Sequence, residues 1–243
     1  GSNNVYIGTE SGAGSTTSDN NTAVGTLTLE DATTGGGNSA FGANCLKSVT
    51  DATRNTGCGD AAGLGITTGS NNTMLGADAG RAGSPGGNRT TADNIVAIGD
   101  ENVATCNIQV DWSVASDQRD KTDFTALDLG LDFVNDLKPV TYKWDKRSKY
   151  GDKYEDDYDL NAQTPDGTHK EDWLDIGFKA QEVEVLEIAA GYKIADKTNL
   201  TTNISGDGKQ YSIQYSKFVP ILVKAVQELS AKNDTLETAN TAL

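Results

Sequence analysis

The chain has 243 residues, of which 27 are glycine, 4 are proline and 36% are apolar. This apolar share is below that of ordinary globular domains, so we expect thin, repetitive structure in part of the chain rather than one round core. The formal net charge of −15 argues against binding to nucleic acid or to an anionic membrane, because both surfaces are themselves negative.

Other features of the sequence argue against further kinds of site. No run of about 18 apolar residues is present, so we expect no membrane insertion. Cys45, Cys58 and Cys106 are odd in number and lack C-x-x-C spacing, which argues against a disulfide framework and a zinc site. We therefore expect no metal and no cofactor. The opening Gly1-Ser2 is typical of a cloning remnant, so we expect the natural protein to extend upstream.

The first part of the chain is a repeat. Glycines recur every 17 residues, at Gly8, Gly25, Gly42, Gly59 and Gly76. An asparagine precedes each glycine by four residues, at Asn4, Asn21, Asn38, Asn55 and Asn72. The residue directly before each glycine is apolar in Ile7, Val24, Phe41, Cys58 and Leu75. A displaced sixth copy occupies residues 94–99. We interpret Cys58 and Cys45, which fall on repeat columns, as packing residues.

One copy of this repeat has too few apolar positions to bury a core, so its stability must come from stacked copies or from identical chains. Glycine and asparagine both suit tight corners between short strands. The segments 20–25 and 38–42 resemble repeats of trimeric adhesin heads and phage fibre shafts, in which strands form a β-roll or an interwoven β-prism. We predict an all-β repetitive trimeric fibre, akin to a β-helix, over residues 1–102.

The pattern changes after the repeat. Residues 103–115 carry two short apolar alternations and form a junction, with a boundary at Ala115/Ser116. The apolar spacing over 127–137 predicts an amphipathic helix that ends before Pro139. The alternation over 140–144 predicts a strand.

A charged stretch follows at residues 145–172, which we interpret as a solvated loop. A calcium site there is the less favoured alternative, because the glycine and terminal glutamate of an EF-hand are missing. We expect His169 in this loop to be exposed and non-catalytic. The stretch 176–184 passes from strand-like to helix-like, and 192–194 and 211–215 are predicted strands.

The last segment, about 217–243, has heptad spacing and predicts a coiled coil. Its seam consists of Val219, Leu222, Val226, Leu229, Asn233, Leu236, Asn240 and Leu243. A lone amphipathic helix packed on its own domain is the alternative, but two consecutive seam asparagines favour an assembly, where they can set register. The fibrous first part favours three chains.

Four blocks in one order carry a resemblance: Ser116-Asp117 with Arg119 and Lys121, then 131–144, then 177–183, then Tyr215 with 219–229. Together they resemble the C-terminal intramolecular chaperone of endosialidases, a family of self-cleaving tail-fibre serine peptidases, over residues 116–243. The resemblance implies an α+β domain that trimerises, guides folding of the preceding fibre and leaves by cleavage between Ala115 and Ser116.

The resemblance also implies a catalytic dyad of Ser116 and Lys121, acting once in cis. A serine hydroxyl needs a base, and a lysine can serve as one where burial favours its neutral form. Asp117 and Arg119 either support the loop or are solvated. Asp120 departs from the family pattern, in which an apolar residue is usual at this place.

The function implied is that of the C-terminal part of a phage tail fibre or tailspike. The expected partners are two further copies, forming a homotrimer, and a host-surface glycan or protein receptor bound through the shaft or an upstream region. The shaft would reside in the virion tail, and the chaperone would be released in the host cytoplasm. The alternative is a non-cleaving trimerisation cap of a receptor-binding tip or surface adhesin. A glycosidase is disfavoured, because no paired-carboxylate architecture is apparent upstream.

Overall fold

The computed structural model describes residues 1–155 and 157–242. Two compact units are present. The first comprises Gly1–Ala104, Lys143–Trp173 and Ile204–Gln210, and the second comprises Thr105–Tyr142, Leu174–Asn203 and the stretch from Tyr211 onward. Two stretches that follow Ser116 in sequence therefore pack with the repeats.

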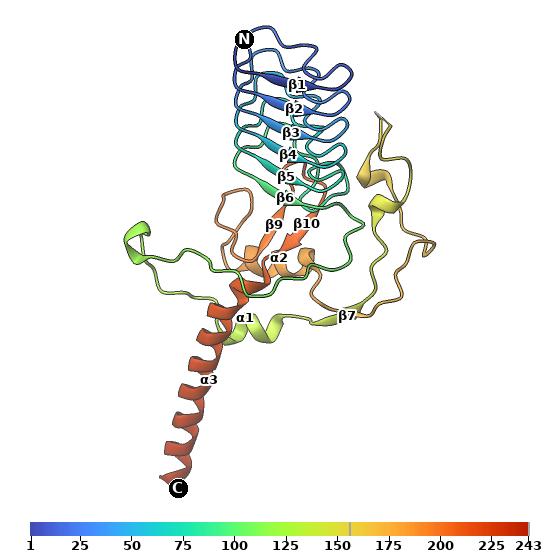
Figure 1. Ribbon diagram of the computed structural model, residues 1–243. Coiled ribbons are helices and arrows are strands. Elements are labelled where there is room, and N and C mark those ends of the chain that lie inside the picture. The colour runs from blue at the N-terminus through green and yellow to red at the C-terminus, as the bar shows by residue number, and fades with distance from the viewer. Residues whose placement is uncertain (156, 243) are drawn as a thin grey trace. The chain divides into compact units, whose positions relative to one another are not determined.

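The repeats form a β-solenoid. Six short strands stack in chain order into one parallel sheet (Figure 1). They are β1 (Val5–Ile7), β2 (Thr22–Val24), β3 (Ser39–Phe41), β4 (Thr56–Cys58), β5 (Thr73–Leu75) and β6 (Val96–Ile98). Val5 lies opposite Thr22, and Thr22 opposite Ser39, so the register equals the 17-residue period. Strands pair within one chain, which favours the β-roll of the two predicted architectures.

The asparagine column forms a ladder inside the solenoid. Asn21, Asn38, Asn55 and Asn72 are buried. The side-chain oxygen of Asn38 accepts the backbone N–H of Asn55 at 2.9 Å, and its amide nitrogen donates to Ala52 O at 2.9 Å. The same two bonds recur one turn earlier at Asn21, with Asn38 N–H and Gly35 O. Each asparagine thus satisfies backbone groups that the turns leave unpaired.

The glycine column is required by its backbone. Gly42 has φ of 131°, and a Cβ there would lie 2.4 Å from Gly59 O in the next turn. Only glycine fits both the conformation and the close approach.

Alanines and larger apolar residues together fill the solenoid interior. The middle residue of a strand points inward, as in Ala23, Ala40, Met74 and Ala97, which pack with Leu29, Leu46, Val49 and Ile66. The column before each glycine points outward because side chains alternate along a strand. Cys45 is buried as predicted, but Cys58 lies on this outward column and is exposed, so its predicted packing role is wrong within one chain.

The second unit is α+β. Its helices are α1 (Leu131–Asp136), α2 (Ala180–Ala189) and α3 (Phe218–Thr241). β7 (Val140–Tyr142) pairs antiparallel with β8 (Asp175–Gly177), and β9 (Thr202–Ile204) forms a second two-stranded sheet with β10 (Tyr211–Ile213). The core contains Leu129, Phe133, Val183, Phe218 and Ile221. 3-10 turns lie at Gln118–Asp120 and Tyr215–Lys217 in this unit, and at Arg147–Lys149 and Leu160–Ala162 in the first unit.

The elements α1, β7, β8, α2, β10 and α3 confirm the predicted helices and strands. The strand predicted at 192–194 is wrong. Tyr192 instead continues the turn that ends α2, and its N–H donates to Glu187 O at 2.8 Å.

The solvated loop predicted over 145–172 is also wrong in part. Ser148 and Leu160 within it are buried. The stretch packs on the last turns of the solenoid, where Lys153 binds the buried carboxylates of Asp78 and Glu101 and the Tyr154 hydroxyl donates to Asp78.

Candidate functional site

Ser116 and Lys121 lie within hydrogen-bonding distance. The Lys121 Nζ donates to the Ser116 Oγ at 2.6 Å and lies 3.3 Å from the Ser116 carbonyl oxygen. The 3-10 turn Gln118–Asp120 between them reverses the chain, so that residues five apart in sequence meet. An amine in contact with a hydroxyl is the arrangement in which a base can remove the hydroxyl proton.

Asp117 and Arg119 build this turn. The Asp117 carboxylate accepts the Arg119 backbone N–H at 2.9 Å and caps the turn. The Arg119 guanidinium binds the same carboxylate, with its closest contact at 2.6 Å. The hydrogen bonds from the side chain and backbone of Arg119 lower the pKa of Asp117. These contacts stabilise the local conformation that places Lys121 on Ser116.

The pair is open to solvent in the single chain. All residues from Asn102 to Ala126 are exposed, including Ala115, Asp120 and the apolar Phe124. A nucleophile and base work best where water is excluded.

Helix α3 has two separate faces. Phe218, Ile221 and Ala225 are buried on its own unit. The predicted seam is a different face, and its described members Val219, Leu222, Val226, Leu229, Asn233, Leu236 and Asn240 are exposed. Leu243, the last predicted seam residue, lies outside the described residues. The intramolecular packing of α3 therefore does not use the heptad seam.

The first unit contains a buried ionic cluster. Lys153 Nζ lies 2.7 Å from Glu101 Oε1, 3.2 Å from Asp78 Oδ2 and 3.7 Å from Asp100 Oδ2. The Lys153 side chain is only 10% exposed. Arg81 also binds Asp78, at 2.8 Å, and the Tyr154 hydroxyl donates to it at 3.0 Å.

The cluster shifts the ionisation of its members. Burial alone would raise the pKa of Asp78, but the Lys153 charge and the hydrogen bonds from Tyr154, Lys153 and Arg81 outweigh it and lower that pKa. Burial alone would lower the pKa of Lys153, but the hydrogen bonds and charges of Glu101 and Asp78 raise it. The cluster thus joins residue 153, from the stretch after Ser116, to the last turns of the repeats. No local sequence pattern pointed to it, because Lys153 lies 52 to 75 residues from the carboxylates that it contacts.

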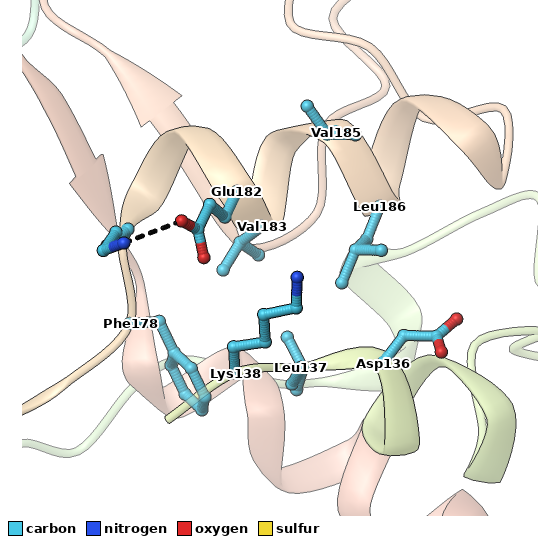
Figure 2. A pocket seen from close by; sticks show the side chains of 9 residues that line it. Asp136, Leu137, Lys138, Phe178, Glu182, Val183, Val185 and Leu186 are labelled. Carbon is cyan, nitrogen blue, oxygen red and sulfur yellow. Dashed lines mark hydrogen bonds and ion pairs between the residues drawn. The ribbon is translucent and has the colours of Figure 1, made fainter. Parts of the chain in front are cut away.

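A shallow pocket of about 180 Å³ lies in the second unit between α2 and the end of α1. Figure 2 shows Lys138 extending from the chain after α1 toward α2, with Leu137 and Phe178 on either side of its base. Lys179 and Glu182 form an ion pair of 2.9 Å at its edge. Ser116 and Lys121 are not among its lining residues, so the pocket is no part of the Ser–Lys site.

Neither a metal cluster nor a membrane span appears in the part of the chain that the structure describes. No three potential ligands among histidine, cysteine, aspartate and glutamate converge there, and no helix there is long and apolar enough to cross a bilayer. His169 is exposed, and its ring makes an edge contact with Tyr150 at 4.8 Å between centroids.

Comparison with known protein families gives a match to part of the chain. No curated protein and no solved structure matches the chain. A family model described as the chaperone of endosialidase matches residues 116–192. The match begins at Ser116 and contains Lys121, α1, β7, β8 and α2. The family resemblance predicted from the sequence is therefore confirmed over residues 116–192, which are similar to the chaperone of endosialidase family, and the predicted block at Tyr215 and 219–229 lies beyond the match.

Proposed function

We propose that this chain is the C-terminal part of a phage tail fibre or tailspike. Its chaperone domain trimerises the chain, promotes folding of the β-solenoid and releases itself by autoproteolysis between Ala115 and Ser116. The observation that carries the proposal is the 2.6 Å hydrogen bond from Lys121 Nζ to Ser116 Oγ, at the first residue of the stretch that matches the chaperone family.

The proposed chemistry uses Ser116 as nucleophile and Lys121 as base. The neutral Lys121 amine removes the Ser116 hydroxyl proton, and Oγ adds to the Ala115 carbonyl carbon. The Ala115–Ser116 amide bond breaks, its nitrogen takes a proton from the Lys121 ammonium, and an ester joins Ala115 to Ser116 Oγ. Water then hydrolyses the ester. Asp117 and Arg119 act as positioning residues for the turn.

Two exposed apolar surfaces support the homotrimer. The seam of α3 is exposed and has heptad spacing. The outward column of the solenoid adds a second stripe, in which Ile7, Phe41, Leu75 and Ile98 are exposed. Contiguous exposed apolar surface of this kind marks an interaction site. Three copies in parallel would bury both stripes, and burial at the assembled junction would favour the neutral form of the Lys121 amine.

The chaperone role is supported by the ionic cluster. Residues 143–173 lie inside the family match and supply Lys153 to carboxylates of the last solenoid turns. A parallel solenoid is built from contacts far apart in sequence, and such pairing forms slowly. A preassembled domain that binds the last turn would give the other turns a template and hold the three chains together.

In this proposal the mature solenoid belongs to the virion tail, and the chaperone leaves in the host cytoplasm during assembly. A host-surface glycan or protein would be bound through the shaft or a region upstream of it. Neither partner is identified by a feature of the described residues.

The decisive experiment is intact mass spectrometry of the expressed wild type beside Ser116→Ala and Lys121→Met, with native mass for the oligomeric state. Ser113→Ala is a matched control three residues upstream. We expect two fragments divided at Ala115/Ser116 for the wild type and Ser113→Ala, and whole trimers for the other two variants. Whole wild-type trimers would instead support the non-cleaving cap, and the next variant would be Asp120→Ile, which removes a carboxylate beside Lys121.

Coupling of cleavage to assembly can be tested separately. Val226→Asp together with Leu229→Asp places charges on the exposed seam, so we expect monomers that fail to cleave. Ala231→Asp, at an exposed position outside the predicted seam, is the control. Cleavage at the wild-type rate in a monomer would contradict the coupling.

A further inference from the structure

The junction before the cleavage site has a pattern that the proposed chemistry does not use. Its even-numbered residues form one face: Cys106, Ile108, Val110, Trp112 and Val114. The residues between them are polar: Asn107, Gln109, Asp111 and Ser113. Strict alternation of this kind is the signature of a strand with one buried face.

In the structure of the single chain, this apolar face is exposed to solvent. Val110, Trp112 and Val114 are 72%, 73% and 83% exposed. Among the described residues, the backbone of 104–115 makes no hydrogen bond to the rest of the chain. In the single chain this segment is irregular, with a bend at Gln109 and Val110. It gains no stability from packing there, and strands become stable in water only when they pair with others and bury one face.

We propose that residues 106–114 pair with the same residues of the other two copies, with the even-numbered face turned toward a common axis. This inference rests on the homotrimer proposed above. The solenoid stripe before the junction and the α3 seam after it would both associate with their own counterparts in parallel. Identical junction segments would then be brought side by side and in register, at high effective concentration.

Charge fits self-association as well. Asp111 is the one charged residue between Val103 and Ala115. It belongs to the polar face, where like charges of three copies can point to solvent. The apolar face carries no charge, so three copies can meet without like-charge repulsion or a buried unpaired ion.

The position of the cleavage site gives this strand a role after release. Cleavage between Ala115 and Ser116 leaves residues 106–114 at the end of the shaft and removes α3. The junction strands would then keep the ends of the three solenoids together once the coiled-coil seam has gone. A cut upstream of residue 106 would instead remove these strands together with the chaperone.

Cys106 provides a native probe, because it begins the proposed buried face. Burial raises the pKa of the Cys45 thiol to about 12, so that thiol stays protonated and unreactive. Cys58 is exposed and is replaced in the test background by Cys58→Ser. Mild oxidation of the full-length Ser116→Ala, Cys58→Ser trimer should link two of the three chains of each trimer through Cys106.

The matched control moves the thiol by one residue. In a Cys106→Ser, Asn107→Cys version of the same protein, the thiol lies on the polar face, and the interchain link should be lost. A second readout is the fluorescence of Trp112 in a Trp144→Phe, Trp173→Phe background. We expect a blue-shifted emission that is protected from a soluble quencher in the trimer.

The outcomes separate this inference from the proposed function. Trimers by native mass that show no Cys106 link, or equal linking at positions 106 and 107, overturn the junction strand while the homotrimer stands. A protected Trp112 without a Cys106 link means that the segment packs on another surface, and also overturns it. Monomers by native mass overturn both proposals.

Discussion

At the scale of single residues, the solenoid depends on backbone conformations that few side chains tolerate. One column of each turn has a left-handed backbone and is occupied by Asn3, Asn20, Gly37, Arg54, Asn71 and Asn94. Asparagine and glycine are the residues that adopt this region at least cost. Arg54, with φ of 58°, is the exception in the column.

We therefore expect Arg54→Asn to stabilise the protein by about 1 kcal/mol, because a β-carbon of an ordinary residue strains a left-handed backbone by that order. Arg54 is exposed, so little packing is lost. The midpoint of urea unfolding should rise. Arg54→Lys keeps the strain and should leave the midpoint unchanged, and a fall for Arg54→Asn would contradict the strain argument.

Glu187 is a second residue whose role depends on its surroundings. It is 1% exposed, yet its carboxylate faces hydroxyl and amide donors rather than a cation. One oxygen accepts the Thr201 hydroxyl at 2.7 Å together with the Thr201 N–H, and the other accepts the hydroxyl and N–H of Thr202. The residue joins α2 to the start of β9.

Replacement of this carboxylate should be costly. Glu187→Gln keeps the shape but turns an amide donor toward other donors, and we expect a loss of about 1–3 kcal/mol in the free energy of unfolding. Glu182→Gln, on the exposed side of the same helix, should change it by less than about 0.5 kcal/mol. Equal midpoints for the two variants in urea would show that the donors around Glu187 find other partners.

At the scale of elements, the solenoid turns are coupled through the asparagine ladder in addition to their apolar core. Asn38 accepts from Asn55 N–H and donates to Ala52 O, and its own N–H is bound by Asn21. Each rung therefore holds three successive turns.

Asn38→Leu should break the stack at one rung. The change leaves the Asn55 N–H and the Ala52 carbonyl buried without partners, at about 1–3 kcal/mol for each unsatisfied group. We expect a lower thermal midpoint and faster amide exchange in β2, β3 and β4, measured by mass spectrometry. Ser39→Ala, at the neighbouring outward position, is the control, and uniform exchange across all turns would contradict a local ladder.

Helix α3 is coupled to α1 by a polar contact. The Glu228 carboxylate accepts the Leu131 N–H at 2.7 Å, at the start of α1, and binds Lys224 at 3.2 Å. The backbone hydrogen bond from Leu131, with the contact to Lys224, lowers the pKa of Glu228. This polar contact adds to the apolar face of α3 and leaves the heptad seam free.

At the scale of the molecule, the Lys153 cluster connects the stretch 143–173 to the solenoid. Removal of one partner from a buried ion pair is strongly destabilising, because the other charge stays buried without compensation. We therefore expect Lys153→Met to lower the free energy of unfolding of the first unit by about 3–5 kcal/mol. The pH dependence follows from the directions of the two pKa shifts.

The lowered pKa of Asp78 contributes stability above its unfolded value of about 3.9, which is lost as pH falls further. The raised pKa of Lys153 contributes stability below about 10.4, which is lost as pH rises further. The urea midpoint of the wild type should therefore exceed that of Lys153→Met at neutral pH, and the difference should shrink below about pH 4. A difference that is independent of pH would contradict an ionic origin.

The sequence by itself determined a repetitive all-β stack, because its 17-residue period is the register of β1 to β5. The pairing of these strands within one chain, which makes the stack a solenoid, was decided by the structure. The sequence also determined the α3 helix and the family resemblance that begins at Ser116. Local turn chemistry brings Lys121 to Ser116 over only five residues, so that candidate site was accessible from sequence spacing and resemblance together.

Only the tertiary structure decided the rest. It placed Cys58 on the outside of the solenoid, buried the Glu187 carboxylate among threonines and packed 143–173 with the repeats. The Lys153 cluster joins residues that no period relates. A one-dimensional pattern records alternation and spacing within an element, whereas these features arise from charges and donors that meet only when distant segments fold together.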